Sequence, residues 1–194
     1  MSRECLGTST LPCPAGGVPR YHRSVQTHLE SVIGEYRRYK QLAERAIAQV
    51  GSDGQLFARL GGEENSIALI VKHVSGNLRS RWLDFLETDG EKPSRARDLE
   101  FEDEAGETRA SLLTRWAVGW RTMFDALEKL TPEDLARTVT IRGEPHSVAQ
   151  AINRNLTHTS YHVGQIVLLA KHWAGDAWRP LTIPKAAAGN PDRS

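Results

Sequence analysis

The feature that most constrains the fold is the recurrence of apolar residues every three to four positions in four long segments of the chain. This spacing gathers apolar side chains on one face of an α-helix. The segments span residues 21–50, 65–87, 109–130 and 147–173. We therefore predict an all-α fold, and four long helices in one chain are typical of a four-helix bundle.

The connections between the predicted helices differ in character. Residues 88–107 are highly charged, contain Gly90 and Pro93 and lack apolar periodicity, which predicts a long crossover between the second and third helices. Connections of this length in a compact domain are often functional. Residues 138–147 hold β-branched side chains around a glycine, which predicts a small hairpin or extended loop before the fourth helix.

The length of the chain fits one domain. At 194 residues it can bury a core without disulfides or a metal as a staple. We expect a disordered N-terminal tail over residues 1–20, a helical domain over 21–183 and an irregular C-terminal tail over 184–194. Cys5 and Cys13 both lie in the N-terminal tail at a spacing that matches no zinc motif, so we expect a cytoplasmic protein without a disulfide framework.

The charge and hydropathy of the chain limit the classes of partner that it can be expected to bind. Lys and Arg total 25 against 24 for Asp and Glu, and a net charge of +1 provides no broad basic surface for a phosphate backbone. No apolar run approaches the roughly 20 residues that a membrane span requires. We therefore expect a small-molecule substrate, and neither nucleic acid nor a membrane as a partner.

Three histidines form the most informative pattern. The run HTSYH places His158 and His162 four residues apart on one face of the fourth predicted helix, where two imidazoles can share an ion. His158 and His162 lie at the border of the apolar face of the fourth predicted helix, and His73 lies at the border of the apolar face of the second. Because sites inside bundles are built from facing helices, we predict one divalent metal ion held by these three residues. The alternative is ordinary half-buried histidines that hydrogen-bond to their neighbours.

Two other kinds of metal site lack the residues that they require. A metalloprotease of the H-E-x-x-H type needs glutamate after the first histidine, and Thr159 stands there. A carboxylate-bridged di-iron site needs Glu-x-x-His motifs, and the chain contains none.

Two stretches carry a family resemblance. SIALIVKHVSGNLRSRWLDFLETDGEKP and LTHTSYHVGQIVLLAKHW resemble the DinB/YfiT-like superfamily of bacterial helical metalloproteins, particularly an uncharacterised branch with a GN-x-x-SRW-x-x-F segment. The resemblance covers residues 21–183. Its most specific element is a histidine in the second helix combined with H-x-x-x-H-x-G-Q-I in the fourth, which here matches His73 and the run from His158 to Ile166.

The resemblance implies properties that composition and spacing do not show. It implies a four-helix bundle with a long link between the second and third helices, a bound zinc or nickel ion and frequently a homodimer. Characterised relatives include thiol-dependent transferases and isomerases, which implies a low-molecular-weight thiol as a cosubstrate.

A set of three histidines leaves at least one coordination position open, as catalytic zinc sites do. A metal in such a site lowers the pKa of bound water or binds a thiol as thiolate. We therefore predict a metal-dependent enzyme, with thiol S-transferase or hydrolase chemistry on a small molecule. The alternative is a non-catalytic, stress-associated dimeric bundle whose metal site is structural or vestigial.

Asn77 and Arg81 are the candidate catalytic residues beside the histidines. Asn77 lies one helical turn beyond His73 and can hydrogen-bond the bound solvent or the substrate. Arg81 lies a further turn along and can hold an anionic substrate. The alternatives are a solvated amide and a solvated charged face. That face would include Arg79, Arg95 and Arg97 paired with Asp84, Glu100 and Asp103.

The remaining candidates are weaker. Tyr161 and Gln165 neighbour the predicted ligands and can orient them. No carboxylate lies beside the motif as an evident general base, and Glu63 and Glu64 are the only candidates. The tryptophans at helical spacing are expected in the core: Trp82, Trp116 and Trp120. The other histidines receive no role: His22, His28, His146 and His172.

Overall fold

The computed structural model describes residues 20–62 and 64–183. Residues 1–19 of the N-terminal tail predicted over 1–20, the predicted C-terminal tail over 184–194 and both cysteines lie outside the described residues, whereas Arg20 begins the first helix. Glu63, one of the two candidate bases, also lies outside the described residues. No described helix is long and apolar enough to cross a membrane.

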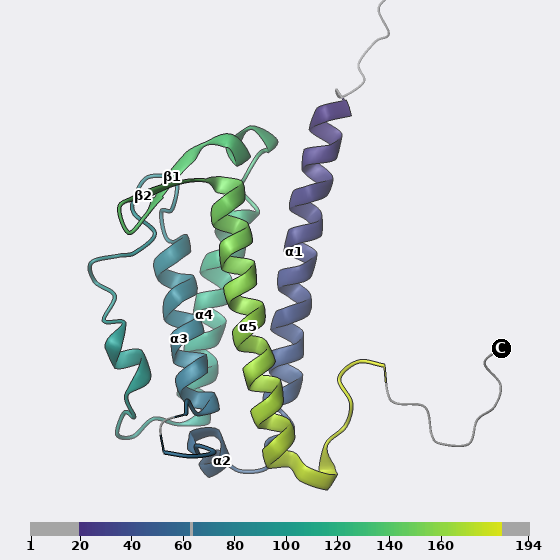
Figure 1. Cartoon of the computed structure of the whole chain (residues 1–194), viewed down its shortest axis with the longest axis vertical. Coiled ribbons are helices and arrows are strands. Elements are labelled where there is room, and N and C mark those ends of the chain that lie inside the picture. The colour runs from purple at the N-terminus through teal and green to yellow at the C-terminus, as the bar shows by residue number, and fades with distance from the viewer. Residues whose placement is uncertain (1–19, 63, 184–194) are drawn as a thin grey trace, which may run out of the picture.

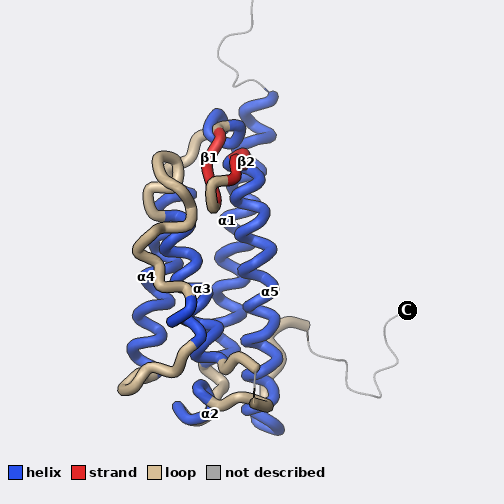
Figure 2. Tube along the Cα trace, turned by 60° about the vertical axis from the view of Figure 1, so that its left-hand side comes forward, coloured by secondary structure: helices blue, strands red, loops and turns tan. Residues whose placement is uncertain are grey.

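The described chain is mostly helical, with one small sheet. Four long helices lie side by side (Figure 1), and they are α1 (Arg20–Ile47), α3 (Ile67–Trp82), α4 (Arg109–Leu127) and α5 (Val148–Ala174). The short elements are α2 (Asp53–Phe57), the 3-10 helices η1 (Asp98–Phe101), η2 (Pro132–Ala136) and η3 (Gly175–Ala177), and the strands β1 (Thr138–Ile141) and β2 (Glu144–Ser147). Figure 2 shows the strands at one end of the long helices and α2 at the other.

The core lies between the long helices, and α3 is its most enclosed element. The three tryptophans are buried there as predicted, and Tyr36 of α1 packs edge-on to Trp120. Polar residues of α3 are buried as well as its apolar face, namely Lys72, His73, Ser75, Asn77 and Ser80. A helix buried all round must satisfy these polar groups within the protein.

A close approach of α3 and α4 depends on one glycine. A Cβ at Gly119 would lie 2.9 Å from the backbone oxygen of Ser75, closer than real Cβ atoms come to backbone. The absence of a side chain at Gly119 therefore sets how tightly α4 packs on α3.

The end of the second predicted helix was placed too late. The helix α3 ends at Trp82 rather than at residue 87, because Leu83 has an extended backbone and Asp84 after it has a left-handed one, with φ 48°. The apolar periodicity continues past this point because Phe85 is also buried and packs on Trp82. Because the turn keeps an apolar side chain in the core, the spacing of apolar residues does not reveal where the helix ends.

Two further helix ends differ from the predictions, and the first is that of α1, which ends at Ile47 rather than at residue 50. The helix α4 ends at Leu127 and not at residue 130, although Leu130 is still buried. The segment between α1 and α3, which lies outside the four predicted helices, contains the five-residue helix α2. The side chain of Gln55 accepts a hydrogen bond from the Ser52 amide over 3.1 Å at the start of this helix.

The fourth predicted helix and its hairpin are confirmed. Ser147 caps α5 by accepting a hydrogen bond from the Gln150 amide over 3.1 Å, and Gly175 ends it with φ 53°. The strands β1 and β2 are antiparallel. Their turn residues, Arg142 and Gly143, both have positive φ, as a two-residue hairpin requires.

The long crossover between α3 and α4 is confirmed, and it lies along α3 (Figure 2). Polar contacts attach it to the helix. Ser80 Oγ donates to the Gly90 carbonyl over 3.2 Å. Lys72 donates to the Glu102 carbonyl and forms an ion pair with Glu107 at 3.3 Å, with both side chains almost fully buried. The crossover is thereby held over the face of α3 that carries His73.

Candidate metal centre

His73 of α3 and His158 and His162 of α5 meet between the two helices. The Nε2 atoms of His73 and His158 lie 3.1 Å apart, and the ring centroids of His158 and His162 are 4.6 Å apart. One ligand atom from each of the three residues lies within 4.8 Å of the others. Two nitrogens bound to the same tetrahedral zinc ion lie about 3.3 Å apart, given bonds near 2.0–2.1 Å. The cluster is therefore of the size that holds one ion.

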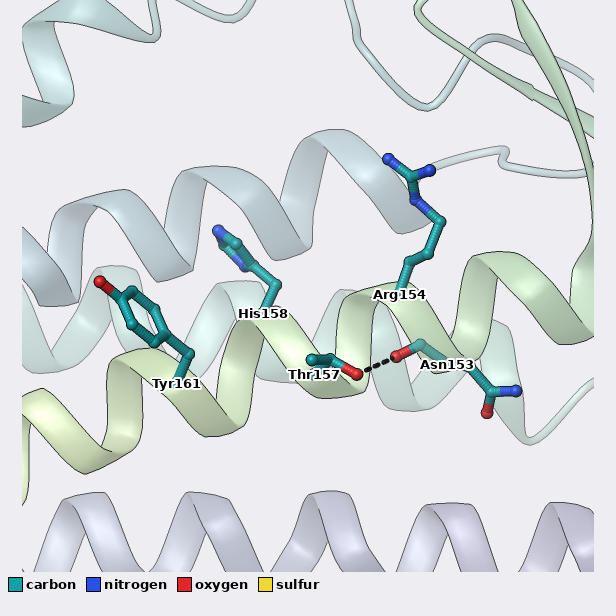
Figure 3. Close-up of a pocket in the computed structure, with 5 residues that line it drawn as sticks. All are labelled: Asn153, Arg154, Thr157, His158 and Tyr161. Atoms are coloured by element: carbon teal, nitrogen blue, oxygen red, sulfur yellow. Dashed lines mark hydrogen bonds between the residues drawn. The ribbon is translucent and has the colours of Figure 1, made fainter.

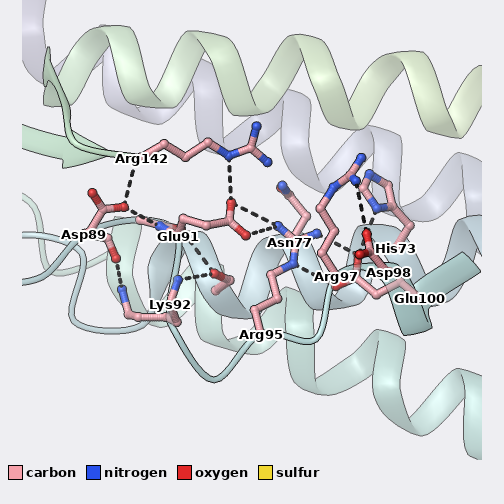
Figure 4. A network of polar contacts seen from close by, with 12 residues as sticks. His73, Asn77, Asp89, Glu91, Lys92, Arg95, Arg97, Asp98, Glu100 and Arg142 are labelled. Carbon is pink, nitrogen blue, oxygen red and sulfur yellow. Dashed lines mark hydrogen bonds and ion pairs between the residues drawn. The ribbon is translucent and has the colours of Figure 1, made fainter.

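Glu100 of the crossover orients His73. Its Oε2 lies 2.9 Å from His73 Nδ1 (Figure 4). Burial opposes ionisation of this carboxyl, but the hydrogen bonds from His73 and Arg95 outweigh burial and hold the pKa of Glu100 below its usual value. The ionised carboxylate accepts, so Nδ1 of His73 donates to it and Nε2 faces the other two imidazoles. Metal-binding histidines are commonly oriented by a carboxylate in this way.

Arg95 in turn fixes Glu100. Its Nε and Nη2 donate to Oε1 and Oε2 of the carboxylate, both over 2.7 Å, in a two-pronged contact. The side chain of Arg95 is 5% exposed, so this contact is sheltered from solvent. Arg95, which was predicted on a solvated charged face, is thus a buried support of the histidine site.

The two histidines of α5 are in the neutral form that binds metals. Burial, followed by repulsion from His162 and His73, lowers the pKa of His158 to about 3. Burial also lowers the pKa of His162, although its contact with Gln165 opposes the shift. Gln165 Oε1 accepts from His162 Nδ1 over 2.8 Å, which leaves Nε2 of His162 available. Nδ1 of His158 is buried without a partner among the described residues.

A buried amide network fixes Asn77 beside the histidines. Asn155 Oδ1 accepts from Tyr36 Oη and from Trp82 Nε1, both over 3.0 Å. Its Nδ2 therefore points the other way and donates to Asn77 Oδ1 over 2.9 Å. In the described part of the chain no hydrogen bond uses Asn77 Nδ2, and Asn77 lines the cavity next to His73.

A cavity of about 270 Å³ adjoins the histidines. Its wall includes His73, Asn77 and His158 and extends to Ile141 at the hairpin. A second, more open hollow of about 550 Å³ is also lined by His158, together with Tyr161. Figure 3 shows Arg154 and His158 projecting from the same side of α5. His158 thus borders two hollows, and a small molecule can reach it from solvent.

The family whose profile matches this sequence is described as a protein of unknown function, DUF1572, and the match covers residues 23–187. The chain belongs to the DUF1572 family. No curated protein and no solved structure matches it.

In this DUF1572 protein the structure brings together most of the predicted site. The three histidines converge, Asn77 and Arg81 line the adjoining cavity, and Gln165 contacts His162 as predicted. Tyr161 packs edge-on to His162 at 5.1 Å between ring centroids but is 64% exposed.

Other candidates lie elsewhere. Glu64 is exposed, and within the described ranges no contact joins it to the histidines. Arg79 is exposed and does not line the cavity. Asp103 pairs with Arg59 at 2.9 Å rather than with the cavity arginines.

The sequence reasoning missed the support around the histidines in this DUF1572 protein. The sequence predicts Glu100 only as a partner for arginines on a charged face, and it gives no signal for Asn155. Gly76, one turn beyond His73, is the one available signal, since a glycine inside a helix often marks close packing against a neighbouring group. Here that group is the Glu100 carboxylate.

Proposed function

We propose that this protein is a metal-dependent enzyme that holds one divalent ion, zinc or nickel, through His73, His158 and His162. The supporting observation is the convergence of three imidazoles from two helices, one of them oriented by a buried carboxylate. Three neutral nitrogen donors and an open approach suit a catalytic rather than a structural site. The proposal includes a four-helix bundle of the DinB/YfiT type.

The residues of the chain have separate tasks in this proposal. Glu100 and Gln165 keep the Nδ1 protons of His73 and His162 in place, so that both Nε2 atoms are directed at the ion. A divalent ion held there supplies a Lewis acid that lowers the pKa of a thiol or a water molecule. Asn77, with its orientation fixed by Asn155, directs Nδ2 as a donor at the substrate or the nucleophile.

Thiol transfer is the form of this chemistry that we favour over hydrolysis. A hydrolase of this kind needs a general base to take the proton of water, commonly a carboxylate. The described lining of the cavity contains no Asp or Glu, and Glu100 is committed to His73 and Arg95. A low-molecular-weight thiol loses its proton more readily than water, so it needs less help from the protein.

We further propose a cytoplasmic homodimer that acts on a small molecule, and not on nucleic acid or a membrane. The near-neutral charge and the cysteine usage support the location and the kind of partner. Tyr161 and Leu168, seven residues apart on α5, are each 64% exposed and so provide apolar area for a second copy.

Metal analysis tests the proposal. Protein purified without chelator is expected to contain about one zinc or nickel ion per chain by mass spectrometry. His162→Ala should lose most of this metal, whereas His172→Ala, an exposed position on the same helix, should retain it. Wild-type protein without metal, and unable to take up either ion, would overturn the proposal.

A second assay addresses the reaction. Small thiols are incubated with electrophilic acceptors in the presence of wild-type protein, chelated protein and protein reloaded with metal. Turnover that stops on chelation and returns on reloading supports the enzyme. A metal-loaded protein that turns over no thiol and hydrolyses no ester or amide supports the non-catalytic alternative instead.

A further inference from the structure

The wall of the 270 Å³ cavity is unusually rich in arginine. Five arginines line it, and no aspartate or glutamate belongs to its described lining. They come from four parts of the chain: Arg81 of α3, Arg95 and Arg97 of the crossover, Arg142 of the hairpin turn and Arg154 of α5. Separate elements thus direct cations at one enclosed space.

The acidic residues nearest the cavity are already engaged. Glu91 pairs with Arg95 at 3.3 Å and with Arg142 at 3.2 Å (Figure 4). Asp89 accepts the backbone amides of Arg142 and Gly143 over 2.9 and 2.8 Å. Glu91 thus neutralises Arg95 and Arg142, and Asp89 is bound to the backbone of the hairpin turn.

Arg81 has no such partner. Its Nη1 is buried and makes no hydrogen bond, and no ion pair joins Arg81 to a carboxylate in the described ranges. Gly90 leaves the space that the side chain occupies, since a Cβ there would lie 2.9 Å from Nη1. A buried guanidinium nitrogen without an acceptor is costly, and the guanidinium stays charged. An anion in the cavity would satisfy it.

Arg154 faces the same space and is also free of carboxylates. Its Nη1 contacts Nε2 of His146 at 3.0 Å, and no described acidic residue forms an ion pair with it. Burial is the main cause that lowers the pKa of Arg81, and repulsion from Arg142, Arg95 and Arg154 adds to it, with the charge of Glu91 opposing. Arg81 and Arg154 line the same cavity, so their positive charges add there.

The two free arginines lie at a defined distance from the histidines. Arg154 precedes His158 by one turn of α5, a rise of about 6 Å. Arg81 follows His73 by two turns of α3, a rise of about 12 Å. Both positions lie towards the hairpin, because the cavity that they line reaches Ile141. An anionic group held there would leave the rest of a compact molecule pointing at the three imidazoles.

We propose that the substrate is a compact anionic molecule whose carboxylate or phosphate group is bound between Arg81 and Arg154, with its reacting group several bonds away at the histidines. The inference rests on the proposed function. Guanidinium groups recognise both anions through two parallel hydrogen bonds. The volume is below the roughly 300–1,000 Å³ of sites for drug-sized ligands, so the molecule is small.

Titration calorimetry with two probes, inorganic phosphate and succinate, tests the proposal at ionic strength held constant with sodium chloride. Wild-type protein is expected to bind at least one of them saturably, with about one site per chain. The probe that binds distinguishes a phosphorylated substrate from a carboxylic acid. Saturable binding of neither probe would overturn the inference.

Variants assign the binding to the arginines. Arg81→Met and Arg154→Met should each weaken binding of the probe by about tenfold or more, since each removes charge-assisted hydrogen bonds. Arg81→Lys should fall between, because it retains the charge and loses the planar fork. Arg79→Met, an exposed position on the same helix, is the matched control and should bind as wild type. Unchanged binding in both Arg81→Met and Arg154→Met would contradict the proposal.

Metal content separates this inference from the proposed function. Arg81→Met should retain about one ion per chain, while His162→Ala should lose the metal and still bind the probe, because His162 does not line the cavity. If the anion binds the metal instead, His162→Ala should lose the probe and Arg81→Met should keep it. That result would overturn this inference and leave the proposed metal site unaffected. Metal binding with no anion binding would leave the proposed function standing.

Discussion

Gly76 and Glu100 fit together in a way that only glycine allows. A Cβ on Gly76 of α3 would lie 2.8 Å from the carboxyl carbon of Glu100, within the range that real Cβ atoms do not enter. The carboxylate therefore lies directly on the backbone of α3, one turn beyond His73. From there it reaches His73 Nδ1 at 2.9 Å and orients the imidazole.

Replacing this glycine should disturb the metal centre more than the fold. In Gly76→Ala the new methyl group displaces the Glu100 carboxylate from His73, so we expect metal affinity to fall by about tenfold or more. Competition with a chromophoric chelator measures the change. Gly34→Ala, in α1 with open space around the Cβ, is the control and should leave metal affinity unchanged. Equal affinities in the two variants would contradict this role of Gly76.

Removing the charge of Glu100 tests the same contact without adding volume. Glu100→Gln keeps the shape of the side chain but weakens the acceptor for His73 Nδ1 and the pairing with Arg95. We expect metal affinity to fall by about 10- to 100-fold, as for other carboxylates that orient metal-binding histidines. The matched control is Glu104→Gln, because Glu104 pairs with Arg115 at the surface. Wild-type affinity in Glu100→Gln would show that the carboxylate does not support the site.

The packing of α3 on α4 makes a separate prediction about stability. In Gly119→Ala the methyl group would meet the backbone of Ser75 at 2.9 Å, and backbone cannot move aside cheaply. We expect the free energy of unfolding to fall by about 1–3 kcal/mol in urea denaturation. Gly34→Ala should instead raise it by about 0.5–1 kcal/mol, because alanine favours the helix. A stable Gly119→Ala protein would mean that the two helices are not this close.

The metal-free protein should lose stability as the pH falls from 7 towards 5. His158 takes up a proton near pH 6.5 in the unfolded chain, but burial lowers its pKa to about 3 in the fold. Between about pH 6.5 and pH 3 the unfolded state therefore binds a proton at His158 that the folded state does not bind. The free energy of unfolding falls as a result. Urea denaturation at several pH values measures the slope. His158→Gln, which cannot titrate, should flatten it, and an identical slope would contradict the low pKa.

Much of the helical framework can be predicted from the sequence. The periodicity locates α1, α3, α4 and α5, and the capping residues Ser147 and Gly175 give the bounds of α5 to within a residue. The pair His158 and His162 follows from helical spacing alone. Placing His73 opposite them required a second helix with a histidine at the border of its apolar face, together with the family resemblance.

The rest of the site depends on contacts that no local pattern encodes. Glu100 lies in a charged crossover, and Arg95 pairs with it only because buried polar groups such as Lys72 hold that segment against α3. Asn155 fixes Asn77 through donors from two other helices, Tyr36 and Trp82. Such polar contacts between distant segments have no period, so the sequence predicts the residue types but not their partners.

The most direct test of the account is anomalous diffraction from crystals of the metal-loaded protein, recorded at the absorption edge of the metal found in it. The account predicts one anomalous peak per chain between the Nε2 atoms of His73, His158 and His162. If the metal is zinc, the peak should lie about 2.0–2.1 Å from each nitrogen. A loaded protein whose only peak lies away from these three imidazoles would contradict it.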